Sequence, residues 1–201
     1  MKFSKNNFKY IVVLDLEGTI EITEISSVIL DTNLKPLSSI QLFVKNYYID
    51  NNSFKNYVNN KYGQYSLSQK FFAECKSLKH QIKTYNRWIH SVIDPNDCIF
   101  ITCGNWDLRK QIPKQLPRYD IKIPYYWKKY VNIKEVFGRL ECLESKGMGF
   151  MLNHYNIPLT GHHHCALDDV FNISKVINYI FNKINFYKYD VDNFFKVRYL
   201  N

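Results

Sequence analysis

The chain has 201 residues, 46% of them hydrophobic and 22% charged, and 27 basic against 18 acidic side chains give a net charge of +9. This composition is ordinary for one globular domain. Its longest apolar runs, such as residues 11–14, are far too short to span a bilayer, and the first ten residues lack the apolar segment of a signal peptide. We therefore expect an intracellular, cytoplasmic protein with no membrane association, whose five dispersed cysteines stay reduced.

The first half of the chain predicts three strands and one long helix. Residues 9–14 form an apolar buried strand, and residues 20–30, "IEITEISSVIL", form a second, with Gly18 in the turn between them. A third strand is expected over "SIQLFVKNY", followed by a polar, Asn-rich connection to about residue 65. A long helix should then cover roughly residues 68–92.

The second half alternates a strand with helices. "DPND" is a turn, "CIFIT" is a short buried strand, and "GNWDLRKQI" opens a helix with Asn105 as its N-cap and Pro113 at its end. Further helices are expected over about 131–137, about 144–154 and from 166 onward. Strands followed by this alternation predict an α/β fold with a mixed sheet. We expect a single domain over 1–201, with a core at about 9–183 and a tail at 184–201 whose role the sequence does not indicate.

Most of the net positive charge lies in one segment. Residues 109–139 hold nine basic and two acidic side chains, interleaved with Tyr125, Tyr126, Trp127 and Tyr130. Cations among flat rings suit a single-stranded nucleic acid, by phosphate neutralisation and base stacking. A solvated basic face is the alternative interpretation.

Four acidic side chains stand where they can converge. Asp15 and Glu17 end the first strand on the same face, where they repel each other unless a cation lies between them, and a hard divalent metal is the natural choice. Asp107 follows the "CIFIT" strand and Asp169 lies in the first turn of the last helix. Strand ends and helix starts gather at one rim of an α/β sheet, and His164 is expected on the loop that enters that helix.

These residues carry a resemblance to a known family. D-x-E-x-T, W-D-L after a strand, and H-x4-D before a helix resemble the DEDDh 3′-to-5′ exonucleases, and within them the histone-mRNA and enhanced-RNA-interference exonucleases. The matching blocks occur in the family's order from residue 10 to about 178, as "DLEGT", "EITEISSVIL", "ITCGNWDL", "WKKYVNIKEVFG" and "HCALDDVFNI". The resemblance implies a ribonuclease H-like mixed sheet flanked by helices. It also implies removal of nucleoside 5′-monophosphates from a single strand, RNA rather than DNA.

The resemblance also implies roles for individual residues. Two Mg²⁺ or Mn²⁺ ions would be held by Asp15, Glu17, Asp107 and Asp169, and His164 would act as the general base. The terminal nucleotide would meet the backbone around Leu16, Gly18 and Thr19, and its base would pack on Trp106. Apart from the resemblance, the clustering of positive charge makes Lys128 and Lys129 expected contacts for the nucleic acid. Targeting would come from this basic segment or from a partner.

The chain departs from the family's pattern near the expected nucleotide pocket. The family's L-T-G-I falls on Lys61, Tyr62, Gly63 and Gln64, which puts the substrate preference in doubt. The loop after D-x-E-x-T is short, so the mouth beside the metals should be more open. Ala166 stands where the family usually has Gly. His162 stands where the family usually has Arg, which suggests that His162 contacts a phosphate.

Three alternative interpretations follow from the same residues. "VVLDLEGT" is also similar to the first motif of haloacid-dehalogenase-like phosphatases, with Asp15 as nucleophile, but the β-branched segment after it argues against a helical cap. "HHHC" at 162–165 with Cys98 and Cys103 suggests zinc, although neighbouring His side chains diverge. A catalytically inactive nucleic-acid-binding module is the third alternative, and the complete acidic set favours activity over it.

Overall fold

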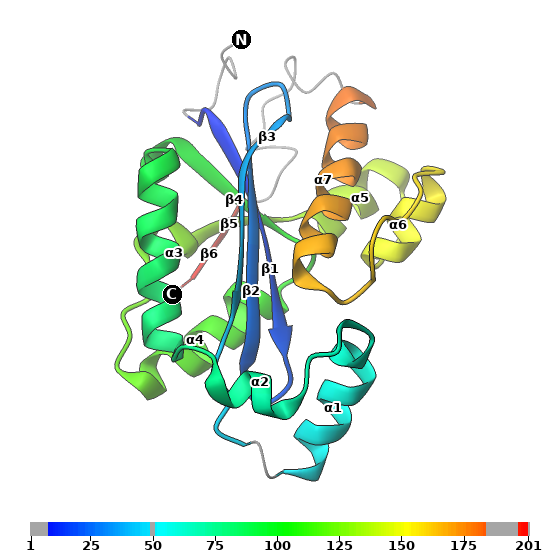
Figure 1. Cartoon of the computed structure of the whole chain (residues 1–201). Coiled ribbons are helices and arrows are strands. Elements are labelled where there is room, and N and C mark those ends of the chain that lie inside the picture. The colour runs from blue at the N-terminus through cyan, green and yellow to red at the C-terminus, as the bar shows by residue number, and fades with distance from the viewer. Residues whose placement is uncertain (1–7, 49–50, 184–196, 201) are drawn as a thin grey trace.

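A six-stranded mixed sheet runs through the molecule in the order β3-β2-β1-β4-β5-β6, with helices on both faces (Figure 1). The computed structural model describes residues 8–48, 51–183 and 197–200. The strands are β1 Tyr10–Gly18, β2 Ile22–Leu30, β3 Pro36–Phe43, β4 Cys98–Thr102, β5 Lys129–Asn132 and β6 Val197–Tyr199. The mixed sheet and its helices confirm the predicted ribonuclease H-like fold class.

Because β1 is an inner strand, its C-terminal end lies near the middle of one end of the sheet. β1 runs antiparallel to β2 and parallel to β4, while β2 and β3 form an antiparallel pair. β5 is parallel to β4, and β6 closes the far side antiparallel to β5. The register pairs Glu17 with Glu24, and a bulge between Glu17 and Gly18 ends the regular pairing.

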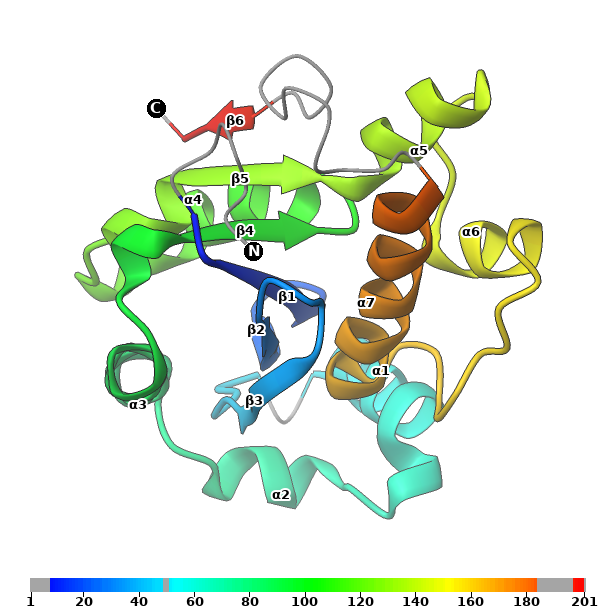
Figure 2. The same ribbon diagram turned by 90° about the horizontal axis from the view of Figure 1, so that it is seen from above.

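Alternating side chains of the central strands bury two separate cores. Val13, Ile101 and Val131 pack against α5 Ile133–Glu141, α6 Met148–His154 and α7 Ala166–Lys183. Leu14 and Phe100 point the other way, against α3 Leu78–Val92 and α4 Ile112–Gln115. Figure 2 shows the sheet between these two helical layers. Because successive residues of a strand face opposite sides, Asp15 and Glu17 share the α7 side with Val13.

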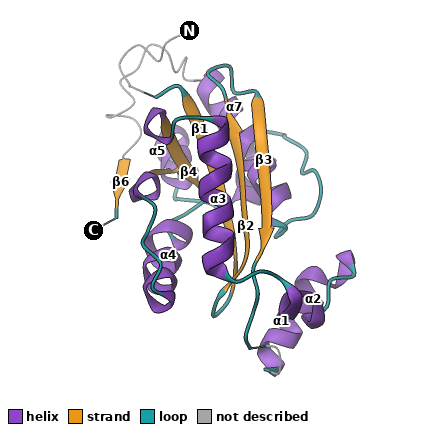
Figure 3. Ribbon diagram, turned by 60° about the vertical axis from the view of Figure 1, so that its left-hand side comes forward, coloured by secondary structure: helices purple, strands orange, loops and turns teal. Residues whose placement is uncertain are grey.

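The first helices lie beyond the end of the sheet where β1 stops (Figure 3). The Asn-rich segment, expected as an irregular connection, forms α1 Asn52–Tyr62. Asn51 caps this helix by accepting hydrogen bonds from the backbone N–H groups of Ser53 and Phe54. Its apolar side chains Phe54, Val58 and Tyr62, spaced four residues apart, are buried. This spacing is typical of a helix, but the segment is otherwise so polar that a loop was predicted.

The predicted helix at 68–92 is two helices, α2 Gln69–Glu74 and α3 Leu78–Val92. The backbone of Cys75 is extended between them, and Lys76 forms an isolated β-bridge with Val44. Ser77 then caps α3 by accepting from the N–H of His80. The bridge between Lys76 and Val44 therefore interrupts the helix that the sequence predicts over residues 68–92.

The structure differs from the sequence predictions after β4. Residues 106–111 form a π-helical turn that leads into α4, and Pro113 lies in the first turn of α4, where its missing N–H costs little. Asn105 does not cap the turn; its side chain accepts a hydrogen bond from the Tyr130 hydroxyl instead. Residues 131–132 belong to β5, so the helix expected from 131 begins at Ile133, and α6 begins at Met148 rather than near 144.

The remaining short elements are helical turns: η1 Gly63–Tyr65, η2 Pro95–Asp97, η4 Leu116–Tyr119 and η5 Tyr125–Lys128. Within the predicted tail, residues 184–196 lie outside the described residues, and β6 follows them. None of the helices described here combines the length and the apolar character needed to cross a membrane.

Candidate active site

Three carboxylates meet where β1 ends beside the first turn of α7. Oxygen atoms of Asp15, Glu17 and Asp169 all lie within 4.8 Å of one another. Asp107, in the turn after β4, is joined to this group through β1, because its Oδ1 accepts a hydrogen bond of 3.1 Å from the backbone N–H of Leu16. The structure thus brings together the four acidic side chains singled out from the sequence.

Burial makes this group electrostatically unfavourable when no cation is bound. Burial raises the pKa of Asp15 well above its usual range, and the neighbouring Asp107 and Glu17 raise it further. Burial also raises the pKa of Glu17 to about 7 and that of Asp107 to about 6, and it raises the pKa of Asp169. Full ionisation of all four carboxylates is therefore unfavourable unless a cation is bound.

The donor set fits a hard divalent cation. Asp15 Oδ2 is buried and has no hydrogen-bond partner in the structure, which is costly for a carboxylate oxygen. Carboxylate oxygens are the ligands that Mg²⁺ and Mn²⁺ prefer. Asp15, Glu17 and Asp169 present such oxygens to one another at the distances given above. The residues at this site are therefore suited to a divalent cation.

A short loop from Gly161 to Cys165 carries three histidines over the cluster. Asp168, on α7, holds the loop by accepting a 2.8 Å hydrogen bond from the backbone N–H of His162. Gly161 has a φ of +70°, and a Cβ there would lie 2.3 Å from the Asp168 carboxylate, so only glycine fits. Asp168 is thus an anchor for the histidine loop.

The rings of His163 and His164 both face the carboxylates. They stack on each other with centroids 3.9 Å apart. His163 Nδ1 lies 3.3 Å from Asp169 Oδ1, and His164 Nδ1 lies 4.0 Å from Glu17 Oε1. The backbone N–H of His164 donates to Asp169 Oδ2 at 3.0 Å. Both histidines, and not His164 alone, are therefore placed beside the site.

His164 is held in its neutral form more strongly than a free histidine. Burial lowers its pKa, and the charges of His163 and Lys61 lower it further, while Asp169 opposes them. Its backbone adopts a left-handed conformation with a φ of +73°. A neutral imidazole at neutral pH is the form that can accept a proton.

A lysine that the sequence analysis did not single out for the site contacts Glu17. The Lys61 ammonium, at the end of α1, forms an ion pair with Glu17 Oε2, and both side chains are almost buried, at 11% and 12% exposure. Its neighbour Tyr62 is buried and contacts Thr23 and Glu24 through its hydroxyl, whereas Gly63 is exposed. In the sequence, Lys61 stood out only as a cation at the position where the expected L-T-G-I match would place a Leu.

The residues expected around the terminal nucleotide differ in their exposure. Trp106 is 37% exposed and directly precedes the buried Asp107, and Thr19 is exposed. A Cβ on Gly18 would lie 2.0 Å from the Glu21 carbonyl oxygen, so the tight turn after Glu17 requires glycine. The side chain of Leu16 is buried, and its N–H is engaged by Asp107. His162 packs its ring edge-on against Tyr65.

The aromatic residues of the basic segment do not form a stacking platform. Tyr126, Trp127 and Tyr130 are buried in the core under α3 and α4, and only Tyr125 is exposed. The predicted stacking surface was wrong because aromatic residues look the same in sequence whether they form a binding surface or pack in a core. Lys129 begins β5 with its ammonium 5.6 Å from the Phe8 ring. Lys128 and Lys129 thus lie toward the opposite end of the sheet from the carboxylates.

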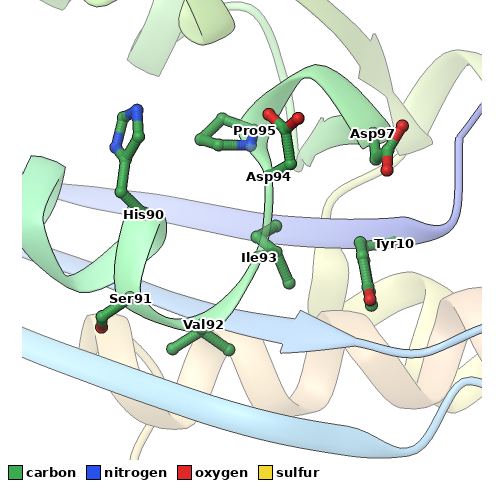
Figure 4. Close-up of a pocket in the computed structure, with 8 residues that line it drawn as sticks. All are labelled: Tyr10, His90, Ser91, Val92, Ile93, Asp94, Pro95 and Asp97. Carbon is green, nitrogen blue, oxygen red and sulfur yellow. The ribbon is translucent and has the colours of Figure 1, made fainter.

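Two hollows lie near these elements. One, of about 290 Å³, adjoins the histidine loop and is lined by Glu24, Gln41, Phe43, Tyr62, Tyr65, Leu67, Cys165, Leu167 and Asp168. The other, about 530 Å³ and shallow, lies at the start of β1, away from the carboxylates (Figure 4). Its acidic residues are already engaged, since Asp97 pairs with Lys9 and Asp94 accepts from the Asn96 N–H.

The geometry gives no support to the zinc site suggested from the sequence with Cys98 and Cys103. Among the described residues, the groups of side chains able to share a metal ion contain no cysteine. The Cys98 thiol lies at hydrogen-bond distance from the Pro95 carbonyl, and burial raises the pKa of Cys98 and Cys103 to about 12. Both therefore remain protonated thiols.

Comparison with known proteins identifies the family. The family model described as Exonuclease (RNase_T) matches residues 11–177, which is most of the chain. The chain belongs to this exonuclease family. An uncharacterised exonuclease domain-containing protein of Arabidopsis thaliana is 30% identical over 179 residues, covering 85% of this chain and 53% of that protein. Human ERI1 exoribonuclease 3 is 28% identical over 105 residues, covering 50% and 31%. The chain spans about half or less of the length of these relatives.

Solved structures agree with this fold. The nuclease domain of 3′hExo, a DEDDh family member bound to rAMP, superposes with a TM-score of 0.78 at 22% identity, covering 89% of this chain and 94% of that one. A 3′-exonuclease structure described as recognising the histone mRNA stem-loop gives 0.80 at 21% identity, covering 91% and 67%. The exonuclease resemblance is confirmed, and the phosphatase alternative is wrong, since residues after Gly18 form an antiparallel strand and not a cap helix.

Proposed function

We propose that this chain is a 3′-to-5′ exonuclease that releases nucleoside 5′-monophosphates from single-stranded RNA, and from single-stranded DNA more weakly. The observation that carries the proposal is the meeting of Asp15, Glu17 and Asp169, with an unpartnered oxygen on Asp15, beside two histidines. Relatives named exoribonucleases support RNA as the substrate.

In this proposal the four carboxylates hold two Mg²⁺ or Mn²⁺ ions. Such ions, when bound, would activate the attacking water and stabilise the leaving 3′ oxygen. Asp15 and Glu17 are fixed by β1, and Asp169 by the first turn of α7. Asp107 is oriented by its hydrogen bond to Leu16, so its carboxylate does not need to reorganise.

His164 is proposed as the general base that takes the proton from the attacking water. Its lowered pKa favours the proton-accepting form, and its exposed ring can reach a water beside the cluster. His163 is the second candidate for this role, because its ring lies closer to a site carboxylate than that of His164.

The terminal nucleotide is proposed to lie at the mouth of the site. Trp106 offers an exposed ring for the base, and the backbone around Gly18 and Thr19 offers polar groups. Gly63 and His162 would flank the nucleotide on the other side, while the buried Tyr62 would act as a supporting wall. Lys128 and Lys129 would contact only a longer strand.

One experiment tests direction and chemistry together. A linear RNA labelled at its 5′ end should shorten progressively from the 3′ hydroxyl when Mg²⁺ is present, with release of mononucleotides. A 3′-phosphorylated strand and a circular strand should resist. Efficient cutting of the circle would contradict an exonuclease, and binding without any metal-dependent release would favour the inactive binding module. Asp15→Asn serves as the inactive control.

A further inference from the structure

The active-site cluster contains a resident cation of its own. The Lys61 ammonium pairs with Glu17 Oε2, the same carboxylate that faces His164 through its other oxygen. It also lies 5.3 Å from the centroid of the Tyr57 ring and 5.8 Å from that of Tyr62. Two aromatic faces and a carboxylate thus hold the ammonium in one place.

The position of Lys61 favours a positive charge. It stands in the last turn of α1, where the helix dipole stabilises cations. As an ammonium paired with Glu17, Lys61 supplies one positive charge to the cluster of four carboxylates.

We propose that Lys61 is a built-in competitor for the metal site, an ammonium that a divalent ion must displace from Glu17. This inference rests on the proposed function, because it takes Glu17 as a metal ligand. An ammonium on Glu17 Oε2 and a divalent ion held by the same carboxylate repel each other strongly in a poorly solvated site. Lys61 would thus lower the affinity of the free enzyme for metal while protecting it from the repulsion among its carboxylates.

Metal titration of the free protein tests the proposal without using activity. Isothermal titration calorimetry with MnCl₂ alone would compare the wild type with Lys61→Met, which removes the charge and keeps the chain length. The dissociation constant for Mn²⁺ should fall about tenfold or more in the variant, since an opposing charge is gone. Lys61→Arg, which keeps the charge, should stay within a few fold of the wild type.

Two controls separate this effect from a general change in charge or fold. Lys55→Met removes an exposed ammonium from the same helix and should leave the Mn²⁺ affinity unchanged. In a Glu17→Gln background, Lys61→Met should add little, because the carboxylate for which it competes is gone. Thermal unfolding should show a larger rise in midpoint on Mn²⁺ addition for Lys61→Met than for the wild type.

The outcomes distinguish the inference from the proposed function. If Asp15→Asn removes Mn²⁺ binding but Lys61→Met leaves the affinity unchanged or weakens it, Lys61 is a structural ion pair and only this inference fails. If neither the wild type nor Lys61→Met takes up Mn²⁺, the proposed metal site itself is wrong. Tighter binding in Lys55→Met as well would reduce the effect to overall charge and overturn the specific role.

Discussion

Asp107 Oδ1 accepts a hydrogen bond from the backbone N–H of Leu16, the residue that stands between Asp15 and Glu17 in β1. This one contact fixes the spacing between the carboxylate after β4 and the two carboxylates of β1. The sheet therefore sets the geometry of the site, and variants of the carboxylates can be tested without disturbing the scaffold.

Asp15→Asn and Asp169→Asn should each reduce Mg²⁺-dependent hydrolysis by roughly 10³-fold or more, because each removes a proposed ligand from a small set that acts as a unit. Neither should lower the unfolding midpoint of the metal-free protein, since each removes a carboxylate whose charge burial disfavours. Asp120→Asn, at an exposed left-handed position that Asn tolerates, is the matched control. Near-wild-type turnover in either site variant would show that the site is misassigned.

His164→Ala should lower the rate by about 10²- to 10⁴-fold and leave Mn²⁺ binding intact, as expected for loss of a general base. His163→Ala provides the comparison, because its ring stacks on that of His164 and contacts Asp169. Single-turnover rates with saturating RNA measure both. A larger loss in His163→Ala would transfer the base role to His163.

The metal-free protein should lose stability as the pH rises from about 4.5 to about 7. Glu17 has a pKa raised to about 7 in the folded state, so the folded protein binds more protons than the unfolded chain in this window. The stability that protonation of Glu17 adds is complete below the pKa of the unfolded chain. It is lost as the pH rises through the pKa of the folded state. Melting curves in EDTA should show this slope, and Glu17→Gln should flatten it. A slope of equal size in Glu17→Gln would assign it to other groups.

Lys128→Glu with Lys129→Glu should weaken binding of a long single strand by several fold but leave binding of a nucleoside 5′-monophosphate unchanged. Both lysines are exposed and lie away from the carboxylates, so only an extended strand could reach them. Fluorescence anisotropy at two salt concentrations measures the effect. Lys79→Glu with Lys83→Glu, exposed on α3, makes the same change in net charge elsewhere. Equal weakening by both pairs would remove any special role for residues 128 and 129.

The central strands and the gathering of the acidic residues could be predicted from sequence because they depend on local patterns. β1 and β4 are short apolar runs, and the ends of parallel strands meet at one edge. The exonuclease resemblance added the order of the motifs. The single-domain boundary, the roles of the site residues and the location in the cell stay predictions.

What the sequence could not give depends on tertiary contacts. Tyr126, Trp127 and Tyr130 look the same in sequence whether they stack on bases or fill a core, and only the packing against α3 decides. Lys61 reaches Glu17 because α1 lies beyond the end of β1, a placement that no spacing along the chain reports. The break at Cys75 likewise follows from the bridge between Lys76 and Val44.

β6 has a consequence for the order in which the molecule assembles. It pairs with β5 through Lys129, Tyr130 and Val131, although α5, α6 and α7 all come between the two strands in the chain. Until residues 197–199 emerge from a ribosome, β5 presents an unpaired edge to its surroundings, and such edges invite pairing with other chains. The nascent chain can therefore misassemble at β5 until residues 197–199 are available, at a stage when the residues of the proposed active site have already been made.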